Sequence, residues 1–284
     1  MSRQSADRRS ARKGATLRYQ ATVEYDGTDF AGFQAQPGTR TVQGELEAAL
    51  ARLSDGERQV VDGAGRTDAG VHATGQVIGF TYAGRLQAQD LTDAINGLLP
   101  PDVAIRGLRR VRAEFNPRRA ARYREYRYTI WNGPRSPLRE RTALAVRNQL
   151  DTAAMARAGA VLVGRHDFSA FGPADRETVR TVLSVRVRRD GRLVTIDVRA
   201  NSFHAGRSSI DVRANSFLRG MVRRIAAVLL EVGRGQLNEN DVAAALAARR
   251  PALNGAAAPA RGLCLRRVVL GRPAGGSNGE HETR

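Results

Sequence analysis

Cysteine and histidine, the residues that build disulfides and most metal sites, are scarce in this sequence. Cys264 is the one cysteine of the chain. A single cysteine excludes an intramolecular disulfide framework and zinc sites built on cysteine ligands. The histidines are His72, His166, His204 and His281. Metal ligands usually recur at short spacings in a sequence, so we expect no metal site.

Long apolar runs are absent too. No stretch approaches the roughly 18 consecutive apolar residues of a membrane-spanning helix. The N-terminus is charged and has no apolar segment of the kind found in secretory signal peptides. We therefore expect a cytoplasmic protein that has no membrane anchor.

Lysine is nearly missing, although the chain is strongly basic. Lys13 is the one lysine among 46 basic side chains, so the other 45 are arginine. With 28 acidic side chains the net charge is +18, and the isoelectric point is near 11.4. The planar guanidinium group of arginine binds phosphate through parallel hydrogen bonds and also stacks on flat rings. This charge balance predicts a polyanionic partner.

Apolar residues recur with two different periods along the chain. Alternation at every second residue predicts strands, and a spacing near 3.6 residues predicts helices. The Asp190-Gly191 pair predicts a tight hairpin, and Asn238 is a candidate helix N-cap. The predicted strands are 17–25, 59–62, 76–82, 103–111, 122–131, 181–188, 193–200 and 262–270. The predicted helices are 41–53, 90–99, 152–163, 216–232 and 239–248.

The order of these elements indicates an α+β fold with two similar halves. We expect largely antiparallel sheets flanked by helices, with a site in the cleft between an N-terminal subdomain, 17–120, and a C-terminal subdomain, 121–270. The basic segment 1–16 and the Gly/Ser/Asn-rich segment 271–284 have the composition of disordered termini.

An octapeptide occurs twice, fourteen residues apart. Ile196–Phe203 and Ile210–Phe217 both read Ile-Asp-Val-Arg-Ala-Asn-Ser-Phe. This period is shorter than that of the usual structural repeats, about 20–50 residues. A second functional strand is one interpretation. We favour an inserted hairpin or loop that the fold tolerates.

The segment 63–77 carries the most informative motif. It reads Gly-Ala-Gly-Arg-Thr-Asp-Ala-Gly-Val-His-Ala-Thr-Gly-Gln-Val, so glycines surround Asp68 and permit close approach of a ligand to the backbone. In an extended chain Arg66 and Asp68 would share a face. Arg66 could then keep the carboxylate ionised for use as a nucleophile or base. The alternative is a loop aspartate that accepts hydrogen bonds from its own backbone.

Further segments occur in an order that matches one known family. They are Glu24–Gly27, Gly32–Gln34, Thr41–Gln43, Leu46-Glu47, Tyr126–Tyr128, Asp167–Ser169 and Phe217–Ile225. Together with the glycine-rich segment, they make the sequence resemble the tRNA pseudouridine synthases of the TruA type, which modify the anticodon stem-loop. The resemblance is collinear over about 17–270.

The resemblance implies the pseudouridine synthase fold, a homodimer, and an isomerase that converts uridines of the tRNA anticodon stem-loop to pseudouridine. Asp68 corresponds to the family's catalytic aspartate, and Tyr126 to its active-site tyrosine. Arg66 and Arg223 correspond to arginines around the aspartate and the displaced base, and Leu263 to an apolar wall of the pocket. The base leaves C1′ through nitrogen and rejoins it through C5, so no cofactor is implied.

A cluster of arginines is interleaved with tyrosines, a pattern typical of RNA contact. The cluster consists of Arg118, Arg119, Arg122, Arg124 and Arg127 with Tyr123, Tyr126 and Tyr128. A solvated strand face is the alternative interpretation. His72 lies within segment 63–77, four residues after Asp68, but we do not assign it as a general base, because the resemblance places the chemistry on Asp68. Asp167 is expected to cap or turn the chain.

Two rival functions fit parts of the sequence. A non-catalytic RNA-binding or chaperone protein would explain the charge, but it would not need the carboxylate of Asp68. A hydrolase of nucleosides or glycosides usually carries two catalytic carboxylates, and Asp68 is the one convincing candidate here.

Overall fold

A computed structural model of the chain describes residues 16–173, 177–201, 217–250 and 256–271. Most of the predicted terminal segments, and residues 210–216 of the second octapeptide, lie outside this part. The strands are β1 Thr16–Tyr25, β2 Asp62–Gly63, β3 His72–Ala83, β4 Val103–Val111, β5 Ala121–Asn132, β6 Leu144–Val146, β7 Gly164–Asp167, β8 Val179–Asp190, β9 Leu193–Asn201 and β10 Leu263–Leu270. The α-helices are α2 Val42–Leu53, α3 Ala88–Leu98, α4 Pro117–Ala120, α5 Thr152–Val161, α6 Met221–Gly233 and α7 Glu239–Ala248.

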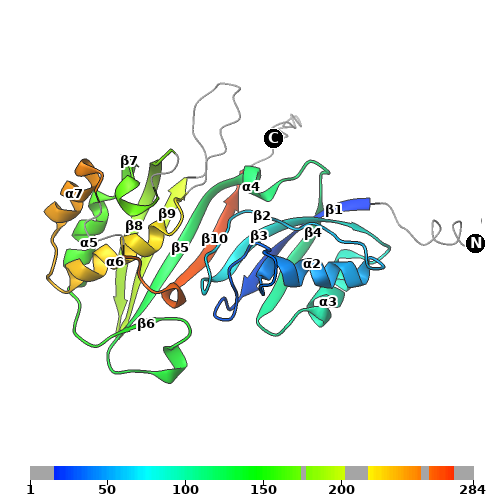
Figure 1. Ribbon diagram of the computed structural model, residues 1–284, viewed down its shortest axis with the longest axis horizontal. Helices are drawn as coiled ribbons and strands as arrows, with labels where there is room; N and C mark the ends of the chain where they lie inside the picture. Colours follow the sequence, from blue (N-terminus) through cyan, green and yellow to red (C-terminus); the bar gives the residue numbers. More distant parts are fainter. Residues whose placement is uncertain (1–15, 174–176, 202–216, 251–255, 272–284) are drawn as a thin grey trace, which may run out of the picture.

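One ten-stranded sheet runs through both halves of the molecule (Figure 1). The strand order is β4-β1-β3-β10-β5-β9-β8-β7, with β2 on β3 and β6 on β5. Neighbouring strands are antiparallel except β3–β10 and β5–β6. The short parallel contact of β10 with β3 joins the halves, because it pairs Cys264 with His72 and Leu265 with Ala73. The predicted α+β class with mainly antiparallel sheet is therefore confirmed, while the division at 120/121 stays a prediction.

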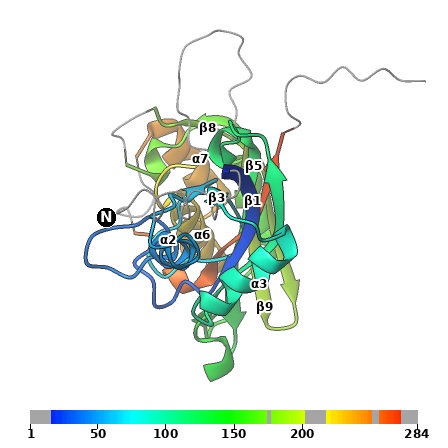
Figure 2. The same ribbon diagram turned by 90° about the vertical axis from the view of Figure 1, so that its right-hand side faces the viewer.

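Helices cover one face of this sheet and leave the other open. Figure 2 shows α2, α6 and α7 on the same side of the strands. Side chains alternate accordingly along β5, where Tyr126, Tyr128 and Ile130 are buried while Arg127 and Thr129 are partly exposed. Such alternation is expected for an antiparallel sheet that packs its core on one face. The site must then lie among the helices or on the open face.

The helix starts follow capping rules that the sequence displays. Thr41 is the N-cap of α2, and its side-chain oxygen accepts a hydrogen bond from the Gly44 N–H. Asn238 caps α7 and forms a reciprocal capping box with Asp241. These side chains satisfy backbone N–H groups that a helix start leaves unpaired. The predicted start of α2 and the predicted cap of α7 are both confirmed.

Several predicted boundaries are wrong, among them the start of β3, which lies at His72 instead of residue 76. The helix predicted from 216 begins only at Met221, because Gly220 adopts φ +70 and interrupts the helical path before it. The strand predicted at 59–62 shrinks to β2. In the β8–β9 hairpin, Asp190 still pairs with Leu193, so the two turn residues are Gly191 and Arg192.

The two copies of the octapeptide contribute to different places. Ile196–Asn201 of the first copy forms most of β9. Phe217, the last residue of the second copy, lies four positions before the first residue of α6 and packs on Tyr126. Residues 202–216 lie outside the described part. The prediction of a tolerated insertion therefore stays a prediction.

The helices of the described chain are short and amphipathic. None of them has both the length and the apolar character needed to cross a bilayer.

Candidate active site

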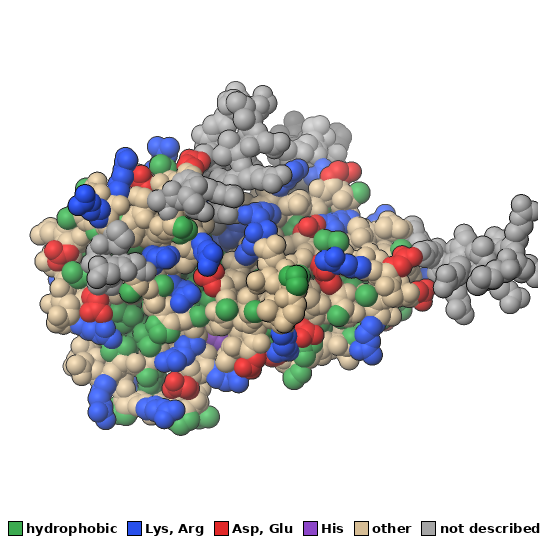
Figure 3. All heavy atoms as spheres, viewed as in Figure 1, with side chains coloured by type: hydrophobic (Ala, Val, Ile, Leu, Met, Phe, Trp, Pro, Cys, Tyr) green, Lys and Arg blue, Asp and Glu red, His purple; other side chains and the backbone are tan. Residues whose placement is uncertain are grey.

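A large cavity opens on the helix-bearing side of the sheet, where the two halves meet. Its volume is about 1210 Å³, and most of its lining comes from the loops 31–36 and 64–71, from β5 and β8, and from the start of α6. Seven arginines and one acidic residue, Asp68, are among the described residues that line it. Figure 3 shows basic side chains gathered over the middle of this face. The cavity is therefore electropositive and suited to an anionic ligand.

The loop that carries Asp68 is fixed to β3 through a glutamine. The Gln76 side chain is fully buried and donates a 2.9 Å hydrogen bond to the Gly65 carbonyl oxygen. Its amide oxygen accepts a 3.2 Å bond from the Gly65 N–H. The Ala64 N–H donates to the Val77 carbonyl oxygen at 2.8 Å. These bonds satisfy the buried backbone of the loop and hold its path.

A neighbouring loop supports the segment from the other side. The hydroxyl groups of Thr67 and Tyr25 lie 2.8 Å apart, and the Phe33 N–H donates to the Thr67 carbonyl oxygen at 3.1 Å. Gly32 has φ +104, and a Cβ atom there would lie 2.8 Å from the same carbonyl oxygen. Only glycine fits this close approach. The backbone on both sides of Asp68 is thus held by contacts to other parts of the N-terminal half.

Asp68 forms an ion pair with an arginine from α6. The distance from Arg223 Nη1 to Asp68 Oδ2 is 3.6 Å. Arg223 Nε donates a 2.7 Å hydrogen bond to the Ala258 carbonyl oxygen, which anchors the guanidinium group. The Asp68 side chain is 36 % exposed, so the carboxylate remains reachable from the cavity. This arrangement brings together two residues predicted from the sequence, one from each half of the chain.

Arg66 does not hold Asp68. Residues 64–68 form a loop instead of a strand, so alternation along an extended chain does not place the two side chains on one face. Arg66 is exposed, and no ion pair joins it to Asp68 among the described residues. Both side chains nevertheless line the cavity. The expectation that Arg66 holds the carboxylate is therefore wrong, whereas Arg223, which the family resemblance placed near Asp68, forms the ion pair.

Tyr126 forms part of the cavity wall beside Asp68. Its side chain is 8 % exposed, and its ring meets Phe217 edge-on with centroids 5.2 Å apart. Burial raises the pKa of the Tyr126 hydroxyl to about 12, and the nearby carboxylate of Asp68 adds to this rise. The hydroxyl is therefore a neutral hydrogen-bonding group at ordinary pH. Leu263 also lines the cavity, as an apolar neighbour.

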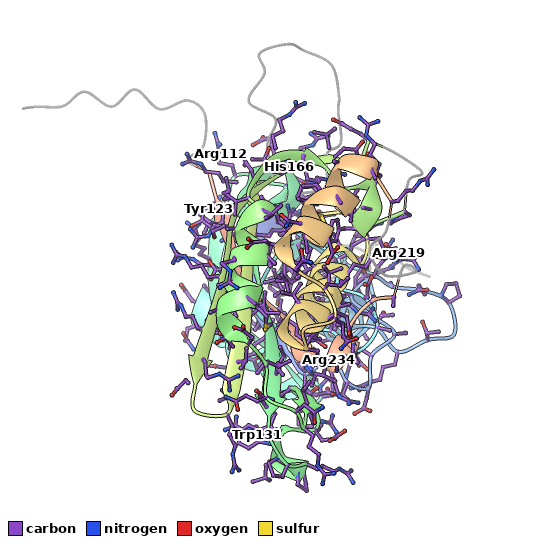
Figure 4. The ribbon with its side chains drawn as sticks, turned by 90° about the vertical axis from the view of Figure 1, so that its left-hand side faces the viewer. Arg112, Tyr123, Trp131, His166, Arg219 and Arg234 are labelled. Carbon is purple, nitrogen blue, oxygen red and sulfur yellow. The ribbon has the colours of Figure 1, made fainter. Side chains whose placement is uncertain are left out.

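The basic and aromatic cluster is split between the two faces of the sheet. Arg124 points to the cavity, is 5 % exposed, and donates from Nε to the Ala64 carbonyl oxygen at 3.1 Å. Burial lowers the pKa of Arg124 to about 10. Arg127 instead pairs with Asp197 on the open face, at 2.7 Å. Figure 4 shows Tyr123 on the side opposite Arg219, away from the cavity. Arg124 is a residue of the site that sequence reasoning did not separate from its neighbours.

His72 and Asp167 both make local structural contacts. His72 Nδ1 accepts a hydrogen bond from the Gly27 N–H, and its Nε2 lies 3.1 Å from the Arg261 carbonyl oxygen. His72 lines a second cavity, which also has Arg127 and Thr129 in its wall and therefore lies on the open face of the sheet, away from the cavity that holds Asp68. Asp167 accepts a 3.0 Å bond from the Ser169 N–H, as expected of a turn residue. In the described part of the chain, no three His, Cys, Asp or Glu side chains are grouped as metal ligands.

Known proteins resemble this chain over most of its length. The model of a family described as tRNA pseudouridine synthase matches residues 21–117 and 158–269. The protein named tRNA pseudouridine synthase A from Geotalea uraniireducens is 41 % identical over 86 % of this chain and 95 % of its own. The protein of the same name from Brevibacillus brevis is 42 % identical over 89 % and 99 %. A solved structure of an unknown protein from Galdieria sulphuraria covers 78 % of this chain and 94 % of its own at 13 % identity, with a TM-score of only 0.19. The family match spans more than half of the chain, and the chain belongs to the tRNA pseudouridine synthase family.

Proposed function

We propose that this protein isomerises uridines 38, 39 and 40 of the tRNA anticodon stem-loop to pseudouridine. The observation that carries the proposal is the position of Asp68, the one carboxylate among the described lining residues of a cavity whose other charged lining residues are arginines, 3.6 Å from Arg223. The names of the curated relatives point to the same reaction.

Asp68 is the proposed catalytic residue. The reaction breaks the bond from N1 of uracil to C1′ of the ribose and forms a bond from C5 to C1′. The C5 proton leaves, and N1 gains a proton, so no external reactant is consumed. Asp68 starts the reaction by attacking C1′ or the uracil ring, or by removing a sugar proton. No cofactor is assigned.

The remaining site residues are proposed to bind the displaced nucleotide. A base inside a stem must be flipped out before chemistry, at a cost of a few kcal/mol. Stacking on an aromatic side chain offsets roughly 1–3 kcal/mol of this cost. Tyr126 offers its ring, which Phe217 holds edge-on. Arg66 and Arg223 lie where they can contact the RNA or the base.

We also propose that the protein is cytoplasmic and forms a homodimer. Each protomer would consist of two subdomains, 17–120 and 121–270. The family resemblance supports the dimer, and the sheet presents an open face that could receive a second copy. Light scattering of the purified protein across a concentration series tests this, because a constant mass near 30.8 kDa would exclude the dimer.

Mapping of pseudouridine in tRNA incubated with the purified protein tests the proposed function. We expect pseudouridine at positions 38–40 and at no other position of the tRNA. RNA binding without product would favour a non-catalytic binding protein. Release of free uracil would favour a hydrolase.

Gln76 is expected to control the position of the catalytic loop. In Gln76→Met both hydrogen bonds to Gly65 are lost, which leaves a partly buried N–H and a partly buried carbonyl without these partners. We expect a loss of about 2 kcal/mol in the free energy of unfolding and a roughly 10–100-fold slower single-turnover rate. Gln89→Met, on the exposed side of α3, is the control and should change neither quantity. An unchanged rate in a destabilised Gln76→Met variant would show that the hydrogen bonds between Gln76 and Gly65 do not matter for catalysis.

Tyr126→Phe separates the ring from the hydroxyl. The ring should keep its contact with Phe217, so we expect RNA binding within about twofold of the wild type and a roughly tenfold slower reaction. Because burial raises the pKa of Tyr126 to about 12, its neutral form persists through the assay range. The pH–rate profiles of both proteins should therefore run parallel from about pH 6 to about pH 10. An alkaline decline present only in the wild type would contradict this assignment.

The duplicated octapeptide allows a clean deletion. Removal of residues 203–216 joins Ser202 to Phe217 and leaves one intact copy of the octapeptide. Since β9 uses the first copy and Tyr126 contacts Phe217, both attachment points are kept. We expect a folded variant whose rate stays within about threefold of the wild type. A folded but inactive deletion variant would show that the insertion is functional.

A further inference from the structure

Arg180 is a buried arginine of the cavity that the proposed mechanism does not use. It lies on β8, its exposure is 8 %, and it faces the same cavity as Asp68. Among the described residues, its one hydrogen bond runs from Nη1 to the carbonyl oxygen of its neighbour Val179, at 2.7 Å. The Nε atom is buried and has no hydrogen-bond partner within the described chain. The guanidinium group therefore has N–H donors at the cavity wall that form no hydrogen bond within the described chain.

Burial of this charge is unfavourable for the free protein. A buried cation normally needs a paired carboxylate and several hydrogen bonds to offset its desolvation. Glu177 attracts Arg180 electrostatically, but no ion pair within 4.0 Å joins Arg180 to any described residue. Desolvation accordingly lowers the pKa of Arg180. A role in stability does not explain the residue, whereas an anionic ligand would complete its hydrogen bonds.

The cavity narrows the choice of ligand. Arg118 and Arg124 line it together with Arg180, and Asp68 is the one acidic residue among the described lining. A planar guanidinium group with free donors matches the oxygens of a phosphate better than it matches a neutral base. We infer that Arg180 binds a backbone phosphate of the RNA strand next to the target nucleotide. This inference rests on the proposed RNA-modifying function.

Substitution of Arg180 should weaken RNA binding without harming the fold. We expect Arg180→Gln to bind an anticodon stem-loop RNA roughly tenfold more weakly than the wild type. The slope of log affinity against log salt should become shallower by about 0.7–0.9, the value for one phosphate contact. Because an unpaired buried charge is removed, the melting temperature should stay the same or rise. The single-turnover rate at saturating RNA should change less than about threefold.

The matched control is Arg186→Gln on the same strand. Arg186 is exposed and pairs in register with Asp197 on the open face, so it carries the same charge on the opposite side of the sheet. We expect wild-type affinity and salt slope for this variant. Arg180→Lys keeps the charge but lacks the planar fork, and it should recover the salt slope while affinity is restored only in part.

Three results would overturn the inference. The first is unchanged affinity and salt slope in Arg180→Gln. The second is an equal loss in Arg186→Gln, which would indicate a general charge effect. The third is a lower melting temperature or a slower saturated rate at unchanged affinity, which would make Arg180 a structural or catalytic residue. Failure of the proposed function is seen separately, because the wild-type protein would then bind RNA without forming pseudouridine.

Discussion

Asp68→Asn is expected to lower the rate of pseudouridine formation by at least about 10³-fold, because an amide can neither attack carbon nor accept a proton as a carboxylate does. The substitution is nearly isosteric. Its neighbour Arg223 is anchored independently by the Ala258 carbonyl oxygen, so the loop and the cavity should keep their shape. Affinity for tRNA should stay within about twofold, since phosphate contacts dominate binding to nucleic acid. Single-turnover kinetics and a binding titration on the same preparation measure the two effects.

The control for this experiment is Asp93→Asn. Asp93 is exposed on α3 and its side chain accepts hydrogen bonds from Gln89, far from the catalytic loop in the chain. We expect wild-type rate and affinity for it. Formation of pseudouridine by Asp68→Asn at more than about one hundredth of the wild-type rate would remove Asp68 from its proposed role. Loss of binding together with rate would instead indicate that the substitution disturbs the cavity.

Local signals in the sequence were sufficient for most elements of the fold. The apolar period of α2 and its Thr41 cap set both the type and the start of that helix. The Tyr, Ile and Trp residues of 122–131 predicted a strand there, and the observed β5 extends one residue further at each end. At the start of α6, where the prediction was wrong, a single backbone feature decided the outcome. Gly220, in a left-handed conformation, interrupts the helical path between α6 and Phe217, whose ring packs on Tyr126.

Contacts between distant parts of the chain could not be predicted from local patterns. Alternation tells which side chains share a face of a strand, but not which face the helices cover. The split of Arg124 from Arg127 therefore needed the structure. Similarly, the partner of Asp68 comes from the other half of the molecule, and only the resemblance to a family pointed to Arg223. Arg180 carried no sequence signal, because its place at the cavity depends on the packing of β8 on β9.

Arg223→Met is expected to slow the reaction by about 10²-fold, the usual effect of removing one fixed charged donor from a reaction site. The ion pair with Asp68 spans 3.6 Å, and the carboxylate side chain is 36 % exposed. A pair that is this open to solvent contributes little to stability, so the free energy of unfolding should change by less than about 1 kcal/mol. A large kinetic effect beside a small stability effect would mean that Arg223 serves the reaction. Quenched single-turnover assays measure the rate, and thermal unfolding measures the stability.

Arg223→Lys and Arg234→Met complete this test. A lysine at 223 keeps a positive charge near Asp68, but it cannot bond the Ala258 carbonyl and reach the carboxylate in the same way as the forked guanidinium group. We therefore expect Arg223→Lys to recover about tenfold of the lost rate. Arg234 lies at the other end of α6, where it pairs with Glu231, and its substitution should leave the rate unchanged. A wild-type rate for Arg223→Met would show that Asp68 works without the ion pair. An Arg223→Lys variant as slow as Arg223→Met would show that the position of the guanidinium group matters more than its charge.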